Sequence, residues 1–280
     1  MNIAVISLLI FSGSLAAGFL GALSGLGGGV IIVPLLTLLF GVDIRYAIGA
    51  SLVSVIATSS GAAAAYVKEG FSNIRLGMFL EMATTFGALL GAAVAGMIST
   101  RVISVLFGIV LLNSAYLSTS RHADTANEDT PDFLANRLHL DGTYPSLHGP
   151  AAYHVHAIPT GFSLMFLAGA LSGLLGIGSG AVKVLAMDRA MHIPFKVSTT
   201  TSNFMIGVTA AASAGVYLNR GYIDPGLAMP VMLGVVLGSF FGSRVLVVTR
   251  TRPLRIIFAC IILILGCEMI YNGIHGGMLP

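Results

Sequence analysis

Charged residues are scarce in this chain of 280 residues: Asp, Glu, Lys and Arg make up 9% of it, against 56% hydrophobic residues. Because soluble domains carry about a quarter charged residues, this chain has too little polar surface to cover its apolar side chains in water. The mean hydropathy of +0.93 points the same way. We therefore expect an integral membrane protein. Its continuous apolar runs favour α-helices over the alternating strands of a β-barrel.

The low net charge, the small number of cysteines and the lack of early basic residues limit the possible functions. The formal net charge of +3 is too small to indicate nucleic-acid binding. It suits a protein that moves a small anion, and basic loops on one membrane face would equally produce it. The two cysteines, Cys260 and Cys267, lie two helical turns apart on one apolar segment, where helix geometry prevents a disulfide, so we expect packed thiols. No Lys or Arg precedes Arg45, so the basic region of a signal peptide is missing and we expect the first segment to be retained.

Eight apolar segments of spanning length follow one another, four before and four after a polar stretch. They fall at roughly 3–40, 46–66, 77–97 and 101–118, and then at 160–191, 198–218, 226–246 and 254–273. We therefore predict an all-α integral membrane protein with two homologous halves. The expected division is a first membrane repeat at 1–118, a polar connecting loop at 119–158 and a second membrane repeat at 159–280.

The two halves are also similar in sequence. The pentapeptide GALSG at residues 21–25 recurs at 169–173, and YVKEG at 66–70 aligns with YLNRG at 217–221. Two matches in the same order indicate an internal duplication, which is the usual architecture of secondary transporters. The sequence leaves open whether the copies are parallel or inverted. The arginines within residues 250–255 indicate a cytoplasmic turn before the last segment.

Each half opens with a cluster of glycines inside an apolar segment: Gly27, Gly28 and Gly29 in the first copy, and Gly176, Gly178 and Gly180 in the second. Glycine costs about 1 kcal/mol relative to alanine inside a helix, so each cluster predicts a helix break. A short helix from Val30 to Phe40, with Pro34 near its first turn, and another from Ala181 would then direct unpaired N–H groups at a shared anion site. The alternative is close helix packing, which the GxxxG spacing at 21–25 and 169–173 favours for those glycines.

Lys183 lies three residues after Gly180, among apolar residues of a membrane segment. An intramembrane charge is costly and is a functional candidate by default; snorkelling to the interface is the alternative. Nearby hydroxyl and amide groups can donate to an oxyanion, unless they cap helices or bond between helices. The predicted substrate-binding residues are Ser24, Gly27, Gly28, Gly29, Ser51, Gly176, Gly178, Ser179, Gly180, Lys183, Thr201, Ser202 and Asn203.

The connecting loop contains five of the seven histidines, namely His122, His139, His148, His154 and His156. Imidazole groups together with the acidic residues of this loop can bind Zn²⁺, Ni²⁺ or Co²⁺. The spacings match no closed site, however, so we expect a solvated loop without a metal. The acidic residues of the apolar segments, Glu81, Asp188 and Glu268, fall near segment ends, and we expect them at the membrane interface.

The duplicated G-x-x-S-G-L-G-G-G-x-x-x-V-P-x-L start, at residues 21–36 and again at 169–185, resembles the TauE/SafE family of sulfite exporters, the group of the toluene-sulfonate uptake permeases. The second copy departs from it where Leu185 replaces Pro34 and where Ile177 and Ser179 interrupt the glycines. The resemblance implies a secondary transporter, most simply an exporter, of a sulfur-containing anion such as sulfite, thiosulfate or an organosulfonate. We expect a multi-pass protein of the plasma (inner) membrane without a cofactor, and a homodimer is compatible with this assignment.

Other functions are compatible with parts of the sequence. A divalent-metal (Ni, Co or Zn) transporter would use the histidine-rich loop, and nothing in the sequence separates an anion channel from a transporter. An intramembrane protease would need a G-x-S-G nucleophile, but Ala22 occupies the position of the first glycine. The histidines nearest to the segments, His192 and His275, lie at segment ends. We therefore do not expect an enzyme.

Overall fold

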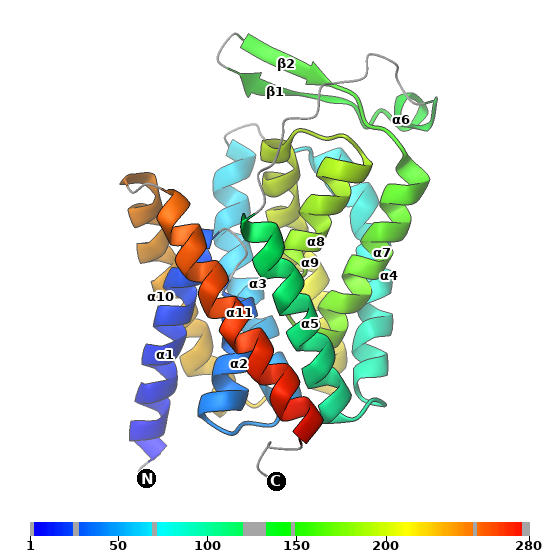
Figure 1. Ribbon diagram of the computed structural model, residues 1–280. Helices are drawn as coiled ribbons and strands as arrows, with labels where there is room; N and C mark the ends of the chain where they lie inside the picture. The colour runs from blue at the N-terminus through cyan, green and yellow to red at the C-terminus, as the bar shows by residue number, and fades with distance from the viewer. Residues whose placement is uncertain are drawn as a thin grey trace.

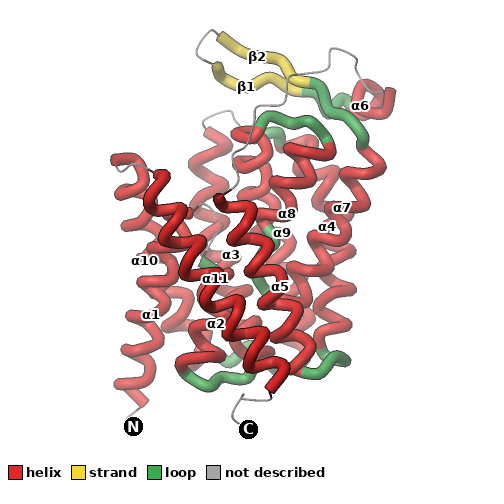
Figure 2. Tube along the Cα trace, in the orientation of Figure 1, coloured by secondary structure: helices red, strands yellow, loops and turns green. Residues whose placement is uncertain are grey.

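The computed structural model describes residues 3–24, 28–68, 72–119, 133–146, 149–248 and 251–275. They form a bundle of long helices with a small β-hairpin at one end (Figure 1, Figure 2). The first half comprises α1 (Ile3–Ser24), α2 (Gly29–Pro34), the π-helical η1 (Leu35–Leu39), α3 (Ile44–Lys68), α4 (Ile74–Ala95) and α5 (Thr100–Thr119). The second comprises α7 (Ile158–Leu175), α8 (Gly180–Leu185), the π-helical η2 (Ala186–Ala190), α9 (Phe195–Asn219), α10 (Pro225–Val248) and α11 (Thr251–His275).

The second half repeats the first at a constant spacing of 151 residues. The pairs α2 and α8, η1 and η2, and α3 and α9 begin and end 151 positions apart, and so do the first residues of α4 and α10 and of α5 and α11. The prediction of an all-α membrane fold with two homologous halves is therefore confirmed. Four described helices, α1, α4, α7 and α10, are long and apolar enough to cross a membrane.

The two halves are inverted with respect to each other. The start of α3 lies beside the segment that follows α9, where the rings of Tyr46 and Tyr222 meet edge to face at 5.7 Å. At the opposite end of the bundle, the backbone N–H of Asn73, just after α3, donates to Thr201 near the start of α9 at 3.1 Å. The equivalent helices α3 and α9 therefore run in opposite directions. This settles the choice between parallel and inverted copies that the sequence left open.

Each half opens with a helical hairpin rather than with one continuous span. The start of α2 lies about two turns into α3, because the hydroxyl of Ser51 lies 3.3 Å from the carbonyl oxygen of Gly29, and the chain after η1 leads directly into α3. Consequently α2 runs against α3 and returns toward the end of the bundle that carries the N-terminus (Figure 1). Pro34 ends α2 and does not lie in its first turn. The π-turn that follows occurs in both halves, although proline precedes it in the first half only.

Glycines bring helices of different halves into close contact. An added Cβ on Gly234 or Gly238 of α10 would meet the backbone of α1, and one on Gly87 or Gly91 of α4 would meet the backbone of α7. In both pairs the helices run parallel, and these are the two most extensive helix contacts of the bundle. Small residues let backbones approach closely where lipid offers no hydrophobic drive for association. Each half therefore packs its first helix on a helix of the other half.

The connection between the halves is folded where the structure describes it, which differs from the solvated loop expected. The short helix α6 (Phe133–Leu138) is followed by the strands β1 (Gly142–Ser146) and β2 (Gly149–Tyr153), which pair antiparallel with Gly142 opposite Tyr153. We call residues 133–153 the hairpin module. The side chains of Ala135, Leu140 and Tyr153 are buried against the end of the bundle. The bundle itself is all-α as predicted, and the strands lie outside it (Figure 2).

Candidate functional site

The second half contains a helix break at the predicted glycines. α7 ends at Leu175, and α8 begins at Gly180. Between them Gly176 and Gly178 have φ of +69°, and Ser179 has φ of +43°. Glycine adopts these left-handed angles freely, whereas a side chain makes them costly. The glycines at 176 and 178 therefore allow the chain to leave one helix and start the next within four residues.

The first half has the equivalent interruption between α1 and α2. Ser24 is the last residue of α1, and the carbonyl oxygen of Gly28 accepts from the N–H groups of Ile31 and Ile32 at the start of α2. Gly27 lies outside the described residues. The helix restarts at Gly29 and in the second half at Gly180, one residue earlier than expected in each case.

The two breaks lie next to each other at the centre of the bundle. The hydroxyl of Ser51 donates to the carbonyl oxygen of Gly176 at 2.9 Å and approaches that of Gly29 at 3.3 Å. In the second half, Ser202 makes the equivalent bond to the carbonyl oxygen of Gly180 at 3.3 Å. Ser51 thus contacts the breaks of both halves, so the structure brings the predicted glycines of the two copies together.

Lys183 belongs to a buried polar cluster formed by α4, α8 and α9. Its side chain is completely buried, and its ammonium donates to the hydroxyl of Thr209 on α9. Thr209 in turn donates to Oε1 of Glu81 on α4 at 2.7 Å, and Oε2 of Glu81 lies 3.9 Å from the lysine Nζ. An ammonium and a carboxylate are therefore held together inside the bundle by one shared hydroxyl group.

Glu81 was expected at the membrane interface, and the structure buries it inside the helix bundle. α4 begins at Ile74, three residues before the predicted segment, because the side chain of Asn73 caps it by accepting from the N–H of Leu76 at 3.0 Å. Glu81 is consequently two turns inside the helix, with 5% of its surface exposed. Asp188 is likewise buried, on η2, whereas Glu268 is exposed. Sequence reasoning missed Thr209 altogether, since a single threonine in a helix gives no signal of its own.

Three other predicted residues, Thr201, Asn203 and Ser179, lie in different environments. Thr201 accepts from the backbone of Asn73 and contacts α4, so it lies away from the glycine breaks. Asn203 is half-buried, and its amide makes no hydrogen bond to any residue in the described ranges. Ser179 lies in the second break, is 4% exposed, and its hydroxyl has no hydrogen-bond partner among the residues that the structure describes.

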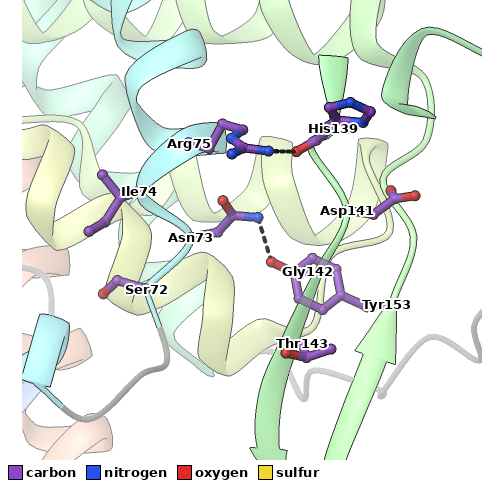
Figure 3. Close-up of a pocket in the computed structure, with 9 residues that line it drawn as sticks. All are labelled: Ser72, Asn73, Ile74, Arg75, His139, Asp141, Gly142, Thr143 and Tyr153. Carbon is purple, nitrogen blue, oxygen red and sulfur yellow. Dashed lines mark hydrogen bonds between the residues drawn. The ribbon is translucent and has the colours of Figure 1, made fainter. Parts of the chain in front are cut away.

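A separate pocket of about 320 Å³ lies outside the membrane part, between the start of α4 and the hairpin module. Figure 3 shows the amide of Asn73 pointing to the hydroxyl of Tyr153, and Arg75 donating to the carbonyl oxygen of His139. Burial raises the pKa of the Tyr153 hydroxyl to about 12; the bond from Asn73 opposes this rise, and the charge of Asp141 adds to it. Asn73 also donates to the carbonyl oxygen of Leu140, so this one side chain joins the module to the bundle.

The loop histidines are dispersed. His154 bonds to the carboxylate of Asp141 at 3.0 Å, and the ring of His156 lies 5.7 Å from that of His192. No three histidine, cysteine or acidic side chains gather into a metal site within the described part of the chain. His122 and His148 lie outside that part.

A membrane-spanning bundle of inverted halves, with broken helices meeting near a buried ionic pair, is the architecture of a membrane transporter. The chain matches the family described as "Sulfite exporter TauE/SafE" over residues 10–269. It therefore belongs to the TauE/SafE family and is a multi-pass membrane transporter rather than an enzyme, as the resemblance implied.

Curated relatives cover nearly the whole chain. It is similar to "Probable membrane transporter protein YunE" of Bacillus subtilis, with 29% identity over 93% of this chain and 96% of the relative. It is also similar to "Probable membrane transporter protein MJ0441" of Methanocaldococcus jannaschii, with 28% identity over 95% of this chain and 96% of the relative. No solved structure matches the chain.

Proposed function

We propose that this protein is a secondary transporter, acting as an exporter, of a sulfur-containing oxyanion such as sulfite, thiosulfate or an organosulfonate. The observation that carries the proposal is the completely buried Lys183, one turn beyond the buried hydroxyl of Ser179. An oxyanion can accept from an ammonium and from a hydroxyl with an unused donor. Ser179 lies in the break of the second half, and Lys183 lies in the first turn of the helix that follows it. The family description supplies the sulfur chemistry.

We place the site at the two helix breaks. Ser51 and Ser202 already donate to break carbonyls, so they would hold the breaks in place, whereas Lys183 and Ser179 would contact the anion. Asn203, with its unused amide, can reorient toward the site. We also propose residues 1–118 and 159–280 as the two duplicated units, with 119–158 as their connection.

We further propose that the hairpin module faces the cytoplasm. Basic residues concentrate at the helix ends on the module's side of the bundle, namely Lys68, Arg75, Arg137, Arg189, Lys196, Arg252 and Arg255. The opposite end, where Figure 1 shows both termini, carries Arg45, Arg101 and Arg220. Cytoplasmic ends are richer in Lys and Arg, so an inner-membrane protein would place its termini outside. The anion would then leave a negative interior down the membrane potential, which favours export by about 2.3 kcal/mol per charge per 100 mV.

Flux in proteoliposomes tests the transport proposal. The purified protein should carry radiolabelled thiosulfate or a sulfonate, with sulfate, chloride and Zn²⁺ as competitors. We expect the Lys183→Ala variant to lose at least tenfold in flux and the Lys196→Ala variant to keep it, because Lys196 is an exposed lysine of α9. Transport of Zn²⁺ but of no sulfur anion would overturn the proposal.

The orientation has its own test. In a background with Cys260 and Cys267 replaced by serine, a single cysteine at Leu138 of the module should react with a membrane-impermeant maleimide only after cells are opened. Labelling in intact cells would place the module outside and reverse the assigned orientation.

A further inference from the structure

The carboxylate of Glu81 is only partly satisfied in its buried position. Oε1 accepts from Thr209 at 2.7 Å and from Thr85 at 3.2 Å. Oε2 has no hydrogen-bond partner among the described residues and lies 3.9 Å from the ammonium of Lys183. This separation exceeds the range of a charge-assisted hydrogen bond. Lys183 and Glu81 balance each other's charge. Oε2 of Glu81, which accepts no hydrogen bond from the described residues, can take a proton.

Among the residues that the structure describes, no other positive charge lies near enough to replace Lys183. α4 packs mainly on α7 and α9. α7 contains no ionisable side chain, and those of α9, Lys196 and Tyr217, lie near the two ends of that helix. On the segment that carries Lys183, Asp188 and Arg189 lie further along η2. On α4 itself, Arg75 is in the first turn and points to the hairpin module. Within the described ranges, the ionisation of Glu81 depends on Lys183.

An anion bound to Lys183 would change this balance. The lysine would then face two negative groups, the anion and the Glu81 carboxylate, inside a region without other positive charge. A carboxylate left without its counter-ion in a low-dielectric region takes a proton instead of keeping its charge. Thr209 fits either state, because its hydroxyl can keep donating to Oε1 when Oε2 takes the proton.

Given the proposed anion site, on which this inference rests, the geometry points to Glu81 as a proton-coupling residue: binding of one anion at Lys183 is accompanied by uptake of one proton on Glu81. The proton comes from the aqueous phase to which the site is open and is released when the anion leaves. No bond other than the O–H bond of the carboxyl group forms or breaks. A monovalent sulfonate would therefore move together with a proton, and its transport would carry no net charge. The membrane potential would then contribute nothing for a monovalent anion, which would follow its own concentration gradient and the proton gradient, whereas a divalent anion would still carry one net negative charge outward with the potential.

The test measures proton uptake directly on the full-length protein in detergent or nanodiscs. Methanesulfonate is a suitable probe because it keeps its single charge from pH 5 to 9, unlike sulfite; thiosulfate is the second probe. Calorimetric titrations in two buffers with different ionisation enthalpies give the number of protons bound with each anion. We expect about one proton for the wild type, and an affinity that falls as the pH rises, by at most about tenfold per pH unit for one coupled proton, since the deprotonated carboxylate competes with the anion.

Two matched variants distinguish a loss of proton coupling at Glu81 from a general effect of the substitution on anion binding. Glu81→Gln imitates the protonated carboxyl group, so it should bind the probe with the low-pH affinity of the wild type at every pH and take up no proton. Glu268→Gln makes the same change at an exposed glutamate of α11 and should keep the wild-type slope. If Glu81→Gln does not fold, the wild-type proton count alone still decides.

The outcomes separate the two proposals. Binding with proton uptake that disappears in Glu81→Gln alone supports the coupling. Anion binding by the wild type without proton uptake, or with uptake that persists in Glu81→Gln, overturns the coupling and leaves the transport proposal intact. Failure of every sulfur anion to bind removes the anion site, and the coupling falls with it.

Discussion

The hydroxyl of Ser51, on α3 of the first half, donates to the carbonyl oxygen of Gly176, in the helix break of the second half, across 2.9 Å. The same hydroxyl lies 3.3 Å from the carbonyl oxygen of Gly29, where the helix of its own half restarts. One small side chain therefore joins the break of the second half to the residue at which the helix of the first half restarts. Such carbonyl groups must be satisfied inside the protein when they lie at membrane depth.

Ser51→Ala should destabilise the protein by about 1–3 kcal/mol, because it removes the donor that Ser51 provides to the carbonyl oxygen of Gly176 in the second break. Thermal unfolding in detergent measures the change. Ser60→Ala is the matched control, since the exposed hydroxyl of Ser60 bonds only to a carbonyl of its own helix; we expect it to alter stability by less than about 0.5 kcal/mol. Equal effects of the two substitutions would show that Ser51 does not support the breaks.

Gly178→Ala should reduce both stability and transport. The residue has φ of +69°, and an added Cβ would lie 2.8 Å from Cγ2 of Ile206. The backbone angle alone costs about 1–2 kcal/mol for a residue with a side chain. Gly215→Ala provides the contrast, because nothing lies within 4 Å of its added Cβ and α9 is regular there; it should leave stability unchanged or raise it slightly. Full flux in Gly178→Ala would argue against a strained break at the transport site.

Lys183→Met should destabilise the fold by about 3–5 kcal/mol, because it leaves the Glu81 carboxylate buried without its positive partner. The double variant Lys183→Met with Glu81→Gln removes both charges and should recover most of that loss. Chemical or thermal unfolding of the wild type, both single variants and the double variant forms a complete cycle. Additive effects would mean that the two side chains do not interact, in spite of their 3.9 Å separation.

Asn73 combines two roles that can be separated by substitution. Asn73→Ala should cost about 1–2 kcal/mol, since it removes the cap of α4 and both bonds to the hairpin module. Asn73→Asp keeps an acceptor for the N–H of Leu76 but removes the donors to Leu140 and Tyr153. Hydrogen exchange over residues 133–153 should therefore increase in both variants, whereas α4 should fray in the alanine variant only. Unchanged exchange in the module would show that Asn73 does not hold it.

The position of the second helix break could be read from the sequence, because few residues other than glycine tolerate the angles found at Gly176 and Gly178. The duplication was equally accessible, since two short matches fixed the spacing of the halves near its observed value. The sequence did not show whether the two copies are parallel or inverted. This depends on whether the chain turns back at α2 or crosses the membrane completely. A glycine cluster is compatible with both paths.

The partner of Lys183 could not be found from the sequence. Glu81 lies more than 100 positions away on another helix, and only the packing of α4 against α9 brings the two together. The predicted segment also began three residues late, since the capping role of Asn73 was not recognised, and this moved Glu81 toward the interface. The hairpin module was missed for a related reason. Short strands rich in proline and glycine carry little strand signal, and these are held by contacts to the bundle.

The exchange of first helices between the halves has a consequence for biosynthesis. α1 packs along α10, and about 200 residues separate the end of one from the start of the other. A nascent chain leaving the ribosome therefore carries its first helix into the bilayer long before its partner has been synthesised. The surface of α1 that will meet α10 must wait in lipid, or against the insertion machinery, until translation is almost complete. Two half-length polypeptides made separately would each lack that partner, and only their production in the same cell could restore a working protein.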